Sequence, residues 1–283
     1  MRSGPPALPN ASCGCISDPP RDAPLTNNPV AEEFLLVERH AEVLTLTINR
    51  PEARNALRMD LLDALGDTLA NHASDEDLKC AVITAVGDQC FAAGGDLKEL
   101  DAVRSIIEAE MMSKRGRRAL HRIRTFPLPV IGALNGLALG GGAELAMACD
   151  LRVAAAHAEI AFLHGQLNCT TAWGGGIDLI AAIGSERALD LLLSARRLSA
   201  SDAAALGIVH RVCADGQSLD DCLKEFLAPY LLRSRQVLKG YKALTGAYRQ
   251  SVHERLLETE QTNFVTTWTH ADHWAAVESR KKK

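Results

Sequence analysis

Apolar residues recur along this chain in short runs that are typical of β-strands. Threonine alternates with aliphatic residues over 43–48, which is the pattern of a half-buried strand. Residues 80–86, apart from Thr84, and residues 130–134 are apolar, and both segments are expected to be central strands. Strands are predicted at 34–39, 43–49, 80–86, 130–134, 150–153 and 160–162.

Helical segments separate these strands. Asn55 is expected to cap the first of them, because asparagine is a favoured residue at a helix N-terminus. Helices are predicted at 56–72, 96–125, 143–149, 177–183, 185–194 and 199–206, and then at 220–231, 234–248 and 251–267. The alternation of strand, turn and helix indicates an α/β fold with a mostly parallel sheet.

A glycine turn joins the predicted strand at 130–134 to the short helix at 143–149. The three glycines at 140–142 leave their backbone N–H groups uncovered at the positive end of a helix dipole, where they suit an anion. Glu144 follows in the first turn of the helix. Enolate formation requires hydrogen-bond donors for the developing oxyanion and a base nearby, and this turn offers both.

A second turn of small residues follows the predicted strand at 80–86. It contains the run FAAGGD and ends at Asp96, where a helix is expected to begin. Each of the two turns can point one N–H group at a shared oxygen atom. The sequence therefore predicts one site built from two turns that lie far apart in the chain.

Composition and charge exclude several classes of protein. The 283 residues are 47% hydrophobic and 23% charged, as in a globular protein. The net charge of −4 and the 4% of aromatic residues do not suit nucleic-acid binding. No apolar run approaches the roughly 20 residues of a membrane span. The glycines at 140–142 do not follow the G-x-G-x-x-G spacing of an NAD site.

Residues 1–30 differ in composition from the rest of the chain. They are rich in proline and hold little that could pack, so we expect a disordered leader. Cys13 and Cys15 lie there without further ligands nearby, and no metal site is predicted. The other cysteines lie singly in apolar or small-residue surroundings, as free thiols do in a reducing cytoplasm, so a cytoplasmic location is expected.

Four segments resemble a known family: NRPEARNAL, FAAGGDLKEL, NGLALGGGAELAMACD and LSASDAAALGIVHRV. In this order they look like the crotonase (enoyl-CoA hydratase/isomerase) superfamily. The resemblance implies a crotonase-type spiral of ββα turns over 31–218. It also implies a C-terminal helical region over 219–283 that packs on the core and on neighbouring subunits, in a homotrimer or hexamer. The implied substrate is an acyl-CoA, with no cofactor beyond its coenzyme A moiety.

The same resemblance assigns roles to residues of the two turns. The N–H groups of Gly95 and Gly141 would form the oxyanion hole for a thioester carbonyl. Glu144 matches the first of the two glutamates that the hydratases of this family use. Residues expected to bind the substrate are Ala93, Asp96, Leu97, Gly140 and Trp173.

The second glutamate of the hydratases has no acidic counterpart in this chain. A count without gaps from Asp150 places His164 at that position, and a histidine can move protons near pH 7. We therefore predict that Glu144 and His164 are the catalytic residues. The predicted activity is hydration of an enoyl-CoA or a related lyase reaction.

Two alternatives stay open. The segment FLHGQLNCTTAWGGG also looks like the ethylmalonyl-CoA decarboxylase branch of the family, which implies decarboxylation of a malonyl-type CoA. An ionised Glu144 would repel the carboxylate of such a substrate, which is the main physical objection. The alternative from another class is a non-catalytic acyl-CoA-binding subunit, and the presence of Glu144 argues against it.

Overall fold

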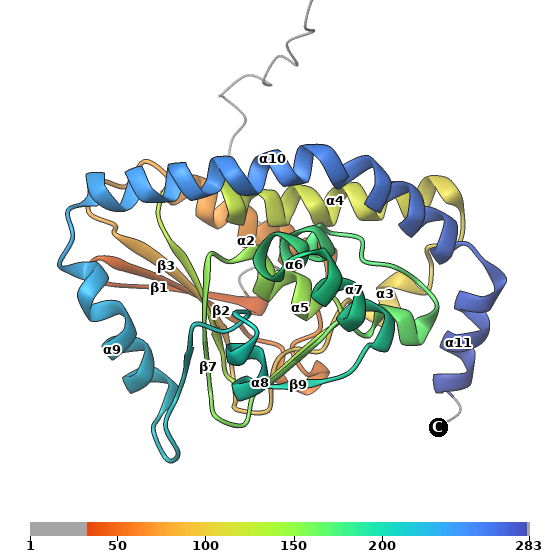
Figure 1. Ribbon diagram of the computed structural model, residues 1–283, viewed down its shortest axis with the longest axis horizontal. Helices are drawn as coiled ribbons and strands as arrows, with labels where there is room; N and C mark the ends of the chain where they lie inside the picture. The colour runs from red at the N-terminus through yellow and green to blue at the C-terminus, as the bar shows by residue number, and fades with distance from the viewer. Residues whose placement is uncertain (1–32, 282–283) are drawn as a thin grey trace, which may run out of the picture.

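The structure of the protein, a computed structural model, describes residues 33–281. The leader expected over residues 1–30 lies outside the described residues. Figure 1 shows α10 running along one side of the molecule next to α4, with α9 at one end and α11 at the other. None of the helices within residues 33–281 is both long and apolar enough to cross a membrane.

Two sheets form the centre of the fold. In the described chain, six strands pair in the order β1-β2-β3-β5-β7-β10, and four pair in the order β4-β6-β8-β9. Only the pairs β1–β2 and β8–β9 are antiparallel. The strands are β1 Leu35–His40, β2 Val43–Ile48, β3 Cys80–Ala85, β4 Cys90–Ala92, β5 Val130–Leu134, β6 Leu137–Leu139, β7 Leu151–Ala154, β8 Glu159–Ala161, β9 Leu198–Ser199 and β10 Arg211–Val212. The predicted α/β fold with a mostly parallel sheet is confirmed.

Helices cover both faces of the larger sheet. Because side chains alternate along a strand, Ala81 and Ile83 of β3 join the main core while Cys80 and Val82 join a second core with Phe226 of α9. The helices are α2 Met59–His72, α3 Leu97–Leu100, α4 Ile106–Thr125, α5 Gly141–Ala148, α6 Gly175–Ile183, α7 Ser185–Ser194, α8 Ala200–Ala205, α9 Leu219–Leu231, α10 Arg235–Trp268 and α11 Ala271–Lys281, with 3-10 turns at Pro51–Ala53 and Leu163–Leu167.

Two helix boundaries differ from the prediction. Asn55 does not cap α2: its side chain accepts from the Arg50 amide and donates to the carbonyls of Val86 and Cys90. These bonds satisfy backbone groups in a buried loop, and α2 begins at Met59. The predicted helix over 96–125 is interrupted, because Ser105 and Glu108 form a capping box that starts α4 anew.

The C-terminal helices also differ from the prediction. The break predicted between 248 and 251 is absent, and α10 is one helix of 34 residues. Ser251 donates its hydroxyl to the carbonyl of Tyr248 inside this helix, so a polar residue that resembles a cap only bonds back to its own turn. Helical structure was expected over 219–283, but α11 was not predicted as a separate helix. It returns the chain toward the site described next.

Candidate active site

The two small-residue turns meet at one edge of the smaller sheet. Strands β4 and β6 pair in parallel, so the turns that follow them leave the sheet in the same direction. Gly94 and Gly140 have φ angles of 113° and 53°, which a glycine adopts without steric cost. The turns lie in contact, since a Cβ atom added to Gly141 would stand 3.2 Å from the amide nitrogen of Gly95.

The amides of Gly95 and Gly141 have no hydrogen-bond acceptor among residues 33–281. Their neighbours fix the turns: Leu57 donates to the Gly94 carbonyl at 2.8 Å, and Gly140 donates to the Ala161 carbonyl at 2.8 Å. Gly141 is the first residue of α5, where an N–H group has no partner inside the helix. Both glycines line one cavity, so two unpaired donors face the same space.

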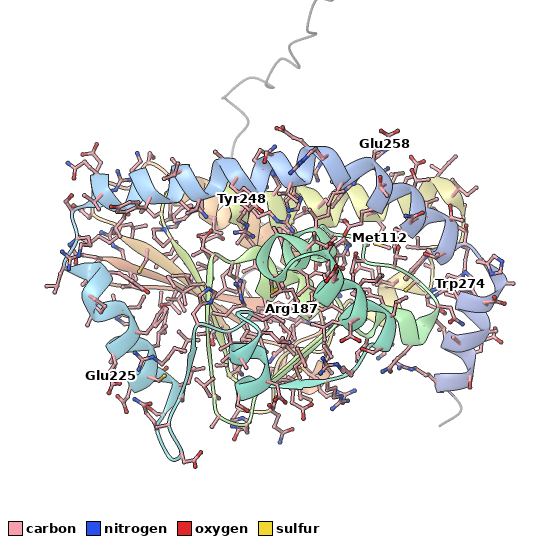
Figure 2. All side chains as sticks on the ribbon, in the orientation of Figure 1. Met112, Arg187, Glu225, Tyr248, Glu258 and Trp274 are labelled. Carbon is pink, nitrogen blue, oxygen red and sulfur yellow. The ribbon has the colours of Figure 1, made fainter. Side chains whose placement is uncertain are left out.

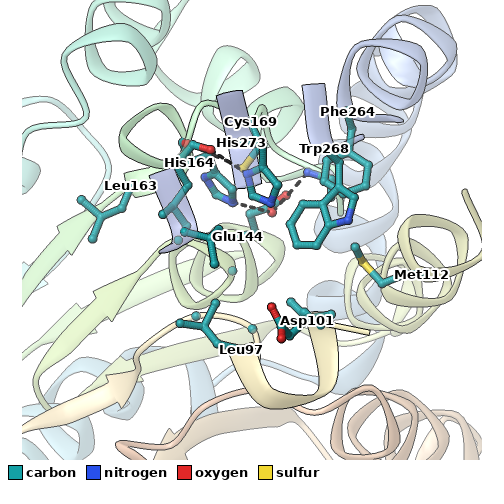
Figure 3. A pocket seen from close by; sticks show the side chains of 18 of the residues that line it. Leu97, Asp101, Met112, Glu144, Leu163, His164, Cys169, Phe264, Trp268 and His273 are labelled. Carbon is teal, nitrogen blue, oxygen red and sulfur yellow. Dashed lines mark hydrogen bonds and ion pairs between the residues drawn. The ribbon is translucent and has the colours of Figure 1, made fainter. Parts of the chain in front are cut away.

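The Trp173 side chain covers the two amides from one side. A Cβ atom added to Gly141 would stand 2.4 Å from Cζ3 of the indole, and one added to Gly116 of α4 would stand 2.4 Å from its Nε1. The indole therefore lies in a slot that only glycines leave open. Figure 3 shows the cavity beside this slot, with Glu144 and His164 on one wall and Leu97 on another.

Glu144 is a buried carboxylate that accepts four N–H bonds. Its Oε1 accepts from His164 Nε2 at 3.1 Å and from the Ala172 amide at 3.3 Å. Its Oε2 accepts from the amides of Trp173 at 2.8 Å and Gly175 at 2.9 Å. Burial alone raises the pKa of the Glu144 carboxyl, but the bond from His164 and those from the two amides outweigh it and hold the pKa below its usual range.

His164 is held in one tautomer by its surroundings. Its Nε2 faces the Glu144 carboxylate, which can only accept, while its Nδ1 is buried and bonds to no atom of the described chain. The proton of the neutral ring therefore lies on Nε2. All four acceptor positions of Glu144 are filled, so within this pair His164 Nε2 donates the hydrogen bond and the Glu144 carboxylate orients the ring.

Eight of the nine predicted site residues line this one cavity: Ala93, Gly95, Leu97, Gly140, Gly141, Glu144, His164 and Trp173. Asp96 is the exception. Its carboxylate caps α3 by accepting from the Lys98 amide at 3.0 Å and pairs with Arg50 at 2.9 Å. The side chain thus shapes the turn that carries the Gly95 amide, and it does not reach the cavity.

The C-terminal helices contribute cavity residues that sequence reasoning missed. Phe264 and Trp268 of α10 and His273 and Trp274 of α11 all line the cavity. Figure 2 shows Trp274 at the same end of the molecule as Met112 of α4. The structure thus places aromatic residues near the end of the chain against the site of their own chain. Phe264 and Trp268 are four residues apart on α10, and this spacing was the one signal in the sequence that they share a helix face.

One further side chain of the cavity, the thiol of Cys169, could have served as a nucleophile. Cys169 lines the cavity, and burial raises the pKa of its thiol to about 12, so it is protonated and not a nucleophile. Within residues 33–281, no group of three or more histidine, cysteine or acidic side chains is arranged to hold a metal ion.

A buried ionic network supports the turn that binds Glu144. Arg124 donates to the Trp173 carbonyl at 2.9 Å and pairs with Asp178 at 2.8 Å. Asp178 also accepts from Arg249 at 3.0 Å and from His253 at 2.8 Å. Burial alone raises the pKa of Asp178, but Arg124 and then Arg249 hold it far below its usual range. The network thus fixes α4, α6 and α10 around the turn.

We expect Asp178→Asn to lower the free energy of unfolding by about 3–5 kcal/mol at pH 7, because two arginines lose a buried partner. Urea denaturation measures this loss. The control is Asp190→Asn, whose pair with Arg196 is exposed to solvent and should contribute less than about 1 kcal/mol. Equal effects of the two substitutions would show that the network does not stabilise the fold.

Comparison with known proteins assigns the chain to a family. The family model described as Enoyl-CoA hydratase/isomerase matches residues 38–282. The chain belongs to the enoyl-CoA hydratase/isomerase family. It is therefore an enzyme of the crotonase superfamily, as the sequence predicted.

Relatives in this family carry more than one activity in their names. A crotonyl-CoA hydratase of Syntrophomonas wolfei is 32% identical over 235 residues, which cover 83% of this chain and 90% of that protein. An ethylmalonyl-CoA decarboxylase of Xenopus laevis is 30% identical over 228 residues, which cover 80% of this chain and 76% of that protein. The family is therefore established, and the names of its members do not select one reaction.

Solved structures support the same fold. An enoyl-CoA hydratase/isomerase from Xanthobacter autotrophicus Py2 superposes with a TM-score of 0.80 at 23% identity, covering 88% of this chain and 93% of that one. An enoyl-CoA hydratase from Bacillus halodurans superposes with a TM-score of 0.79 at 21% identity, covering 87% and 99%. At these identities the likeness shows the crotonase fold and nothing about the substrate.

Proposed function

We propose that this enzyme catalyses a lyase reaction on an acyl-CoA by forming a thioester enolate. The observation that supports the proposal is the pair of unpaired amides, Gly95 and Gly141, on one cavity. A thioester oxygen that accepts from both would be stabilised as the negative charge of the enolate develops. Each such donor is typically worth about 2.7–4 kcal/mol in the transition state.

The bonds around Glu144 favour decarboxylation of a malonyl-type CoA. Hydration needs a base with a free lone pair to take a proton from water, and the acceptor positions of Glu144 are already filled. In decarboxylation the bond to the carboxylate breaks, carbon dioxide leaves, and the electron pair stays on the α-carbon as the enolate. A doubly protonated His164 ring then gives its Nε2 proton to this carbon, is left neutral, and regains a proton from solvent. The four donors around Glu144 offset the charge that would repel the substrate carboxylate.

Hydration of an enoyl-CoA is the second candidate. The names of the crotonyl-CoA hydratase and of other relatives favour it, and His164 and Glu144 offer a donor and an acceptor 3.1 Å apart. For this reaction one bond to Glu144 would have to open when substrate and water enter. Hydrogen bonds of an active site often rearrange when the substrate binds, so hydration is retained as the second candidate reaction.

A panel of thioesters separates the two reactions. Malonyl-, methylmalonyl- and ethylmalonyl-CoA are incubated with the enzyme beside crotonyl-CoA, and the mass of each product is measured. We expect the malonyl-type substrates to lose carbon dioxide and crotonyl-CoA to stay unchanged. Addition of water to crotonyl-CoA without any decarboxylation would select hydration instead.

We propose that the enzyme assembles as a trimer or a pair of trimers through α10. Val237, Tyr241, Leu244 and Tyr248 are exposed and repeat at spacings of four and three residues, so they form one apolar stripe along this helix. Light scattering at micromolar concentration should give three or six times the 30.4 kDa mass of the chain. A stable monomer under these conditions would contradict the proposal, and Leu244→Glu should weaken an assembly that does form.

We also propose that the coenzyme A moiety of the substrate is the only cofactor and that the enzyme works in the cytoplasm. The cysteines of the described chain support a reducing location, because all six are free and buried: Cys80, Cys90, Cys149, Cys169, Cys213 and Cys222.

A further inference from the structure

The cavity beside the two amides is small. Its volume is about 140 Å³. At one side it is lined by Leu97, which is 58% exposed, and this side is the mouth. At the other side it is lined by Met112, Phe264 and Trp268, whose side chains are buried. A thioester held at the amides would therefore extend its coenzyme A toward the mouth and its acyl group toward the buried end.

The buried end is held rigidly by Trp268. Its indole Nε1 donates to the Val103 carbonyl at 2.9 Å, which ties α10 to the loop before α4. Its ring centroid lies 5.3 Å from that of Phe264, 4.4 Å from that of His273 and 5.5 Å from that of Trp274. Figure 3 shows Phe264, Trp268 and Met112 together on one side of the cavity. A side chain bonded and packed on several sides cannot swing aside for a longer ligand without losing these contacts.

We infer that Phe264 and Trp268 limit the substrate to a short acyl group of about six non-hydrogen atoms, because a cavity of about 150 Å³ holds one benzene ring. This inference rests on the proposed function, since it places the thioester at the Gly95 and Gly141 amides. It adds the substrate class: short, compact acyl chains of four to six carbons. The specificity comes from α10 of the same chain.

Chain-length series test the inference in the full-length enzyme. The turnover of four-, six-, eight- and ten-carbon acyl-CoAs is measured for whichever thioester class the enzyme converts. For the wild type we expect kcat/KM to fall at least about tenfold between four and eight carbons, since one misfitting methylene already changes kcat/KM by about 10–200-fold. Equal kcat/KM values for four and eight carbons would overturn the inference.

Two variants assign the limit to the named side chains. Phe264→Leu and Trp268→Phe each shorten one wall residue, and each should raise the ratio of eight- to four-carbon kcat/KM at least about tenfold. The control is Phe226→Leu on α9. It makes the same change of side chain in the second core, away from the cavity, and should leave the ratio of eight- to four-carbon kcat/KM unchanged. If neither cavity variant changes the ratio more than Phe226→Leu does, the two residues do not set the chain length.

Binding separates failure of this inference from failure of the proposed function. Should the wild type convert no thioester, the proposed function fails. Calorimetric binding of butyryl-CoA and decanoyl-CoA, which need not react, then tests the pocket alone. We expect Phe264→Leu to raise the affinity for decanoyl-CoA relative to butyryl-CoA about tenfold over the wild type. An unchanged ratio of affinities would overturn the inference by itself.

Discussion

We expect the Gly141→Pro variant to lose turnover of every thioester that the wild type converts, while its fold and assembly persist. Proline removes the N–H donor, and it is well tolerated at the first position of a helix, where Gly141 lies. Loss of one oxyanion donor typically lowers kcat by about 10²–10³-fold. Turnover is measured with the thioester panel, and circular dichroism and light scattering report the fold and the assembly.

The structure shows why this variant needs a matched control. Any Cβ atom at Gly141 would stand 2.4 Å from the Trp173 ring, so proline adds a steric change to the loss of the donor. Gly141→Ala adds the same Cβ atom and keeps the N–H group. Both substitutions are therefore made in a Trp173→Leu background, which removes the clashing ring.

The comparison isolates the donor. In the Trp173→Leu background, we expect Gly141→Ala to stay within about tenfold of its parent and Gly141→Pro to fall by a further 10²–10³-fold or so. Equal activity of the alanine and proline variants would refute the oxyanion role of Gly141, whatever their common level.

The second large effect concerns the proton. We expect His164→Gln to lower kcat by about 10²–10⁴-fold with little change in KM, which is the usual range for a lost acid or base. Glutamine can still donate an N–H bond to Oε1 of Glu144, so the buried carboxylate keeps its fourth partner. The variant thus removes proton transfer and leaves the local structure in place, and an unchanged melting temperature confirms this.

Glu144→Gln provides the contrast. Its amide nitrogen would face N–H donors that now bond to a carboxylate oxygen, which should destabilise the turn by about 1–3 kcal/mol. We therefore expect lower activity together with a lower melting temperature, whereas His164→Gln loses activity alone. If His164→Gln turns over substrate as the wild type does, His164 is not the proton donor.

The parts of the site that lie on short local segments could be predicted from the sequence. The glycine turns and Glu144 lie soon after the predicted strands at 80–86 and 130–134. The short strands that lead directly into the turns, β4 and β6, were not predicted, and their parallel pairing brings the turns together. A gapless count selected His164 as a catalytic candidate, and in the structure its Nε2 lies 3.1 Å from Oε1 of Glu144. Within one strand–turn–helix unit, residues that are close in the sequence are also close in space.

Contacts between distant segments could not be predicted. Phe264 and Trp268 reach the cavity only because α10 is unbroken, and the sequence around Ser251 suggested a break. The four donors to Glu144 include backbone amides some thirty residues away, and no side-chain pattern reports where a backbone amide points. The family resemblance implied that Asp96 binds the substrate, but its carboxylate pairs with Arg50 and accepts from the Lys98 amide, which turns it away from the cavity.

The product masses formed in D₂O test the enolate most directly. We expect the wild type to convert a short malonyl-type CoA to the acyl-CoA that lacks carbon dioxide and carries one new deuterium on its α-carbon. In the Trp173→Leu background, we expect Gly141→Pro to form this product about 10²–10³-fold more slowly than Gly141→Ala does. Correctly folded wild-type protein that leaves every malonyl-type and enoyl thioester unchanged in mass would contradict the account.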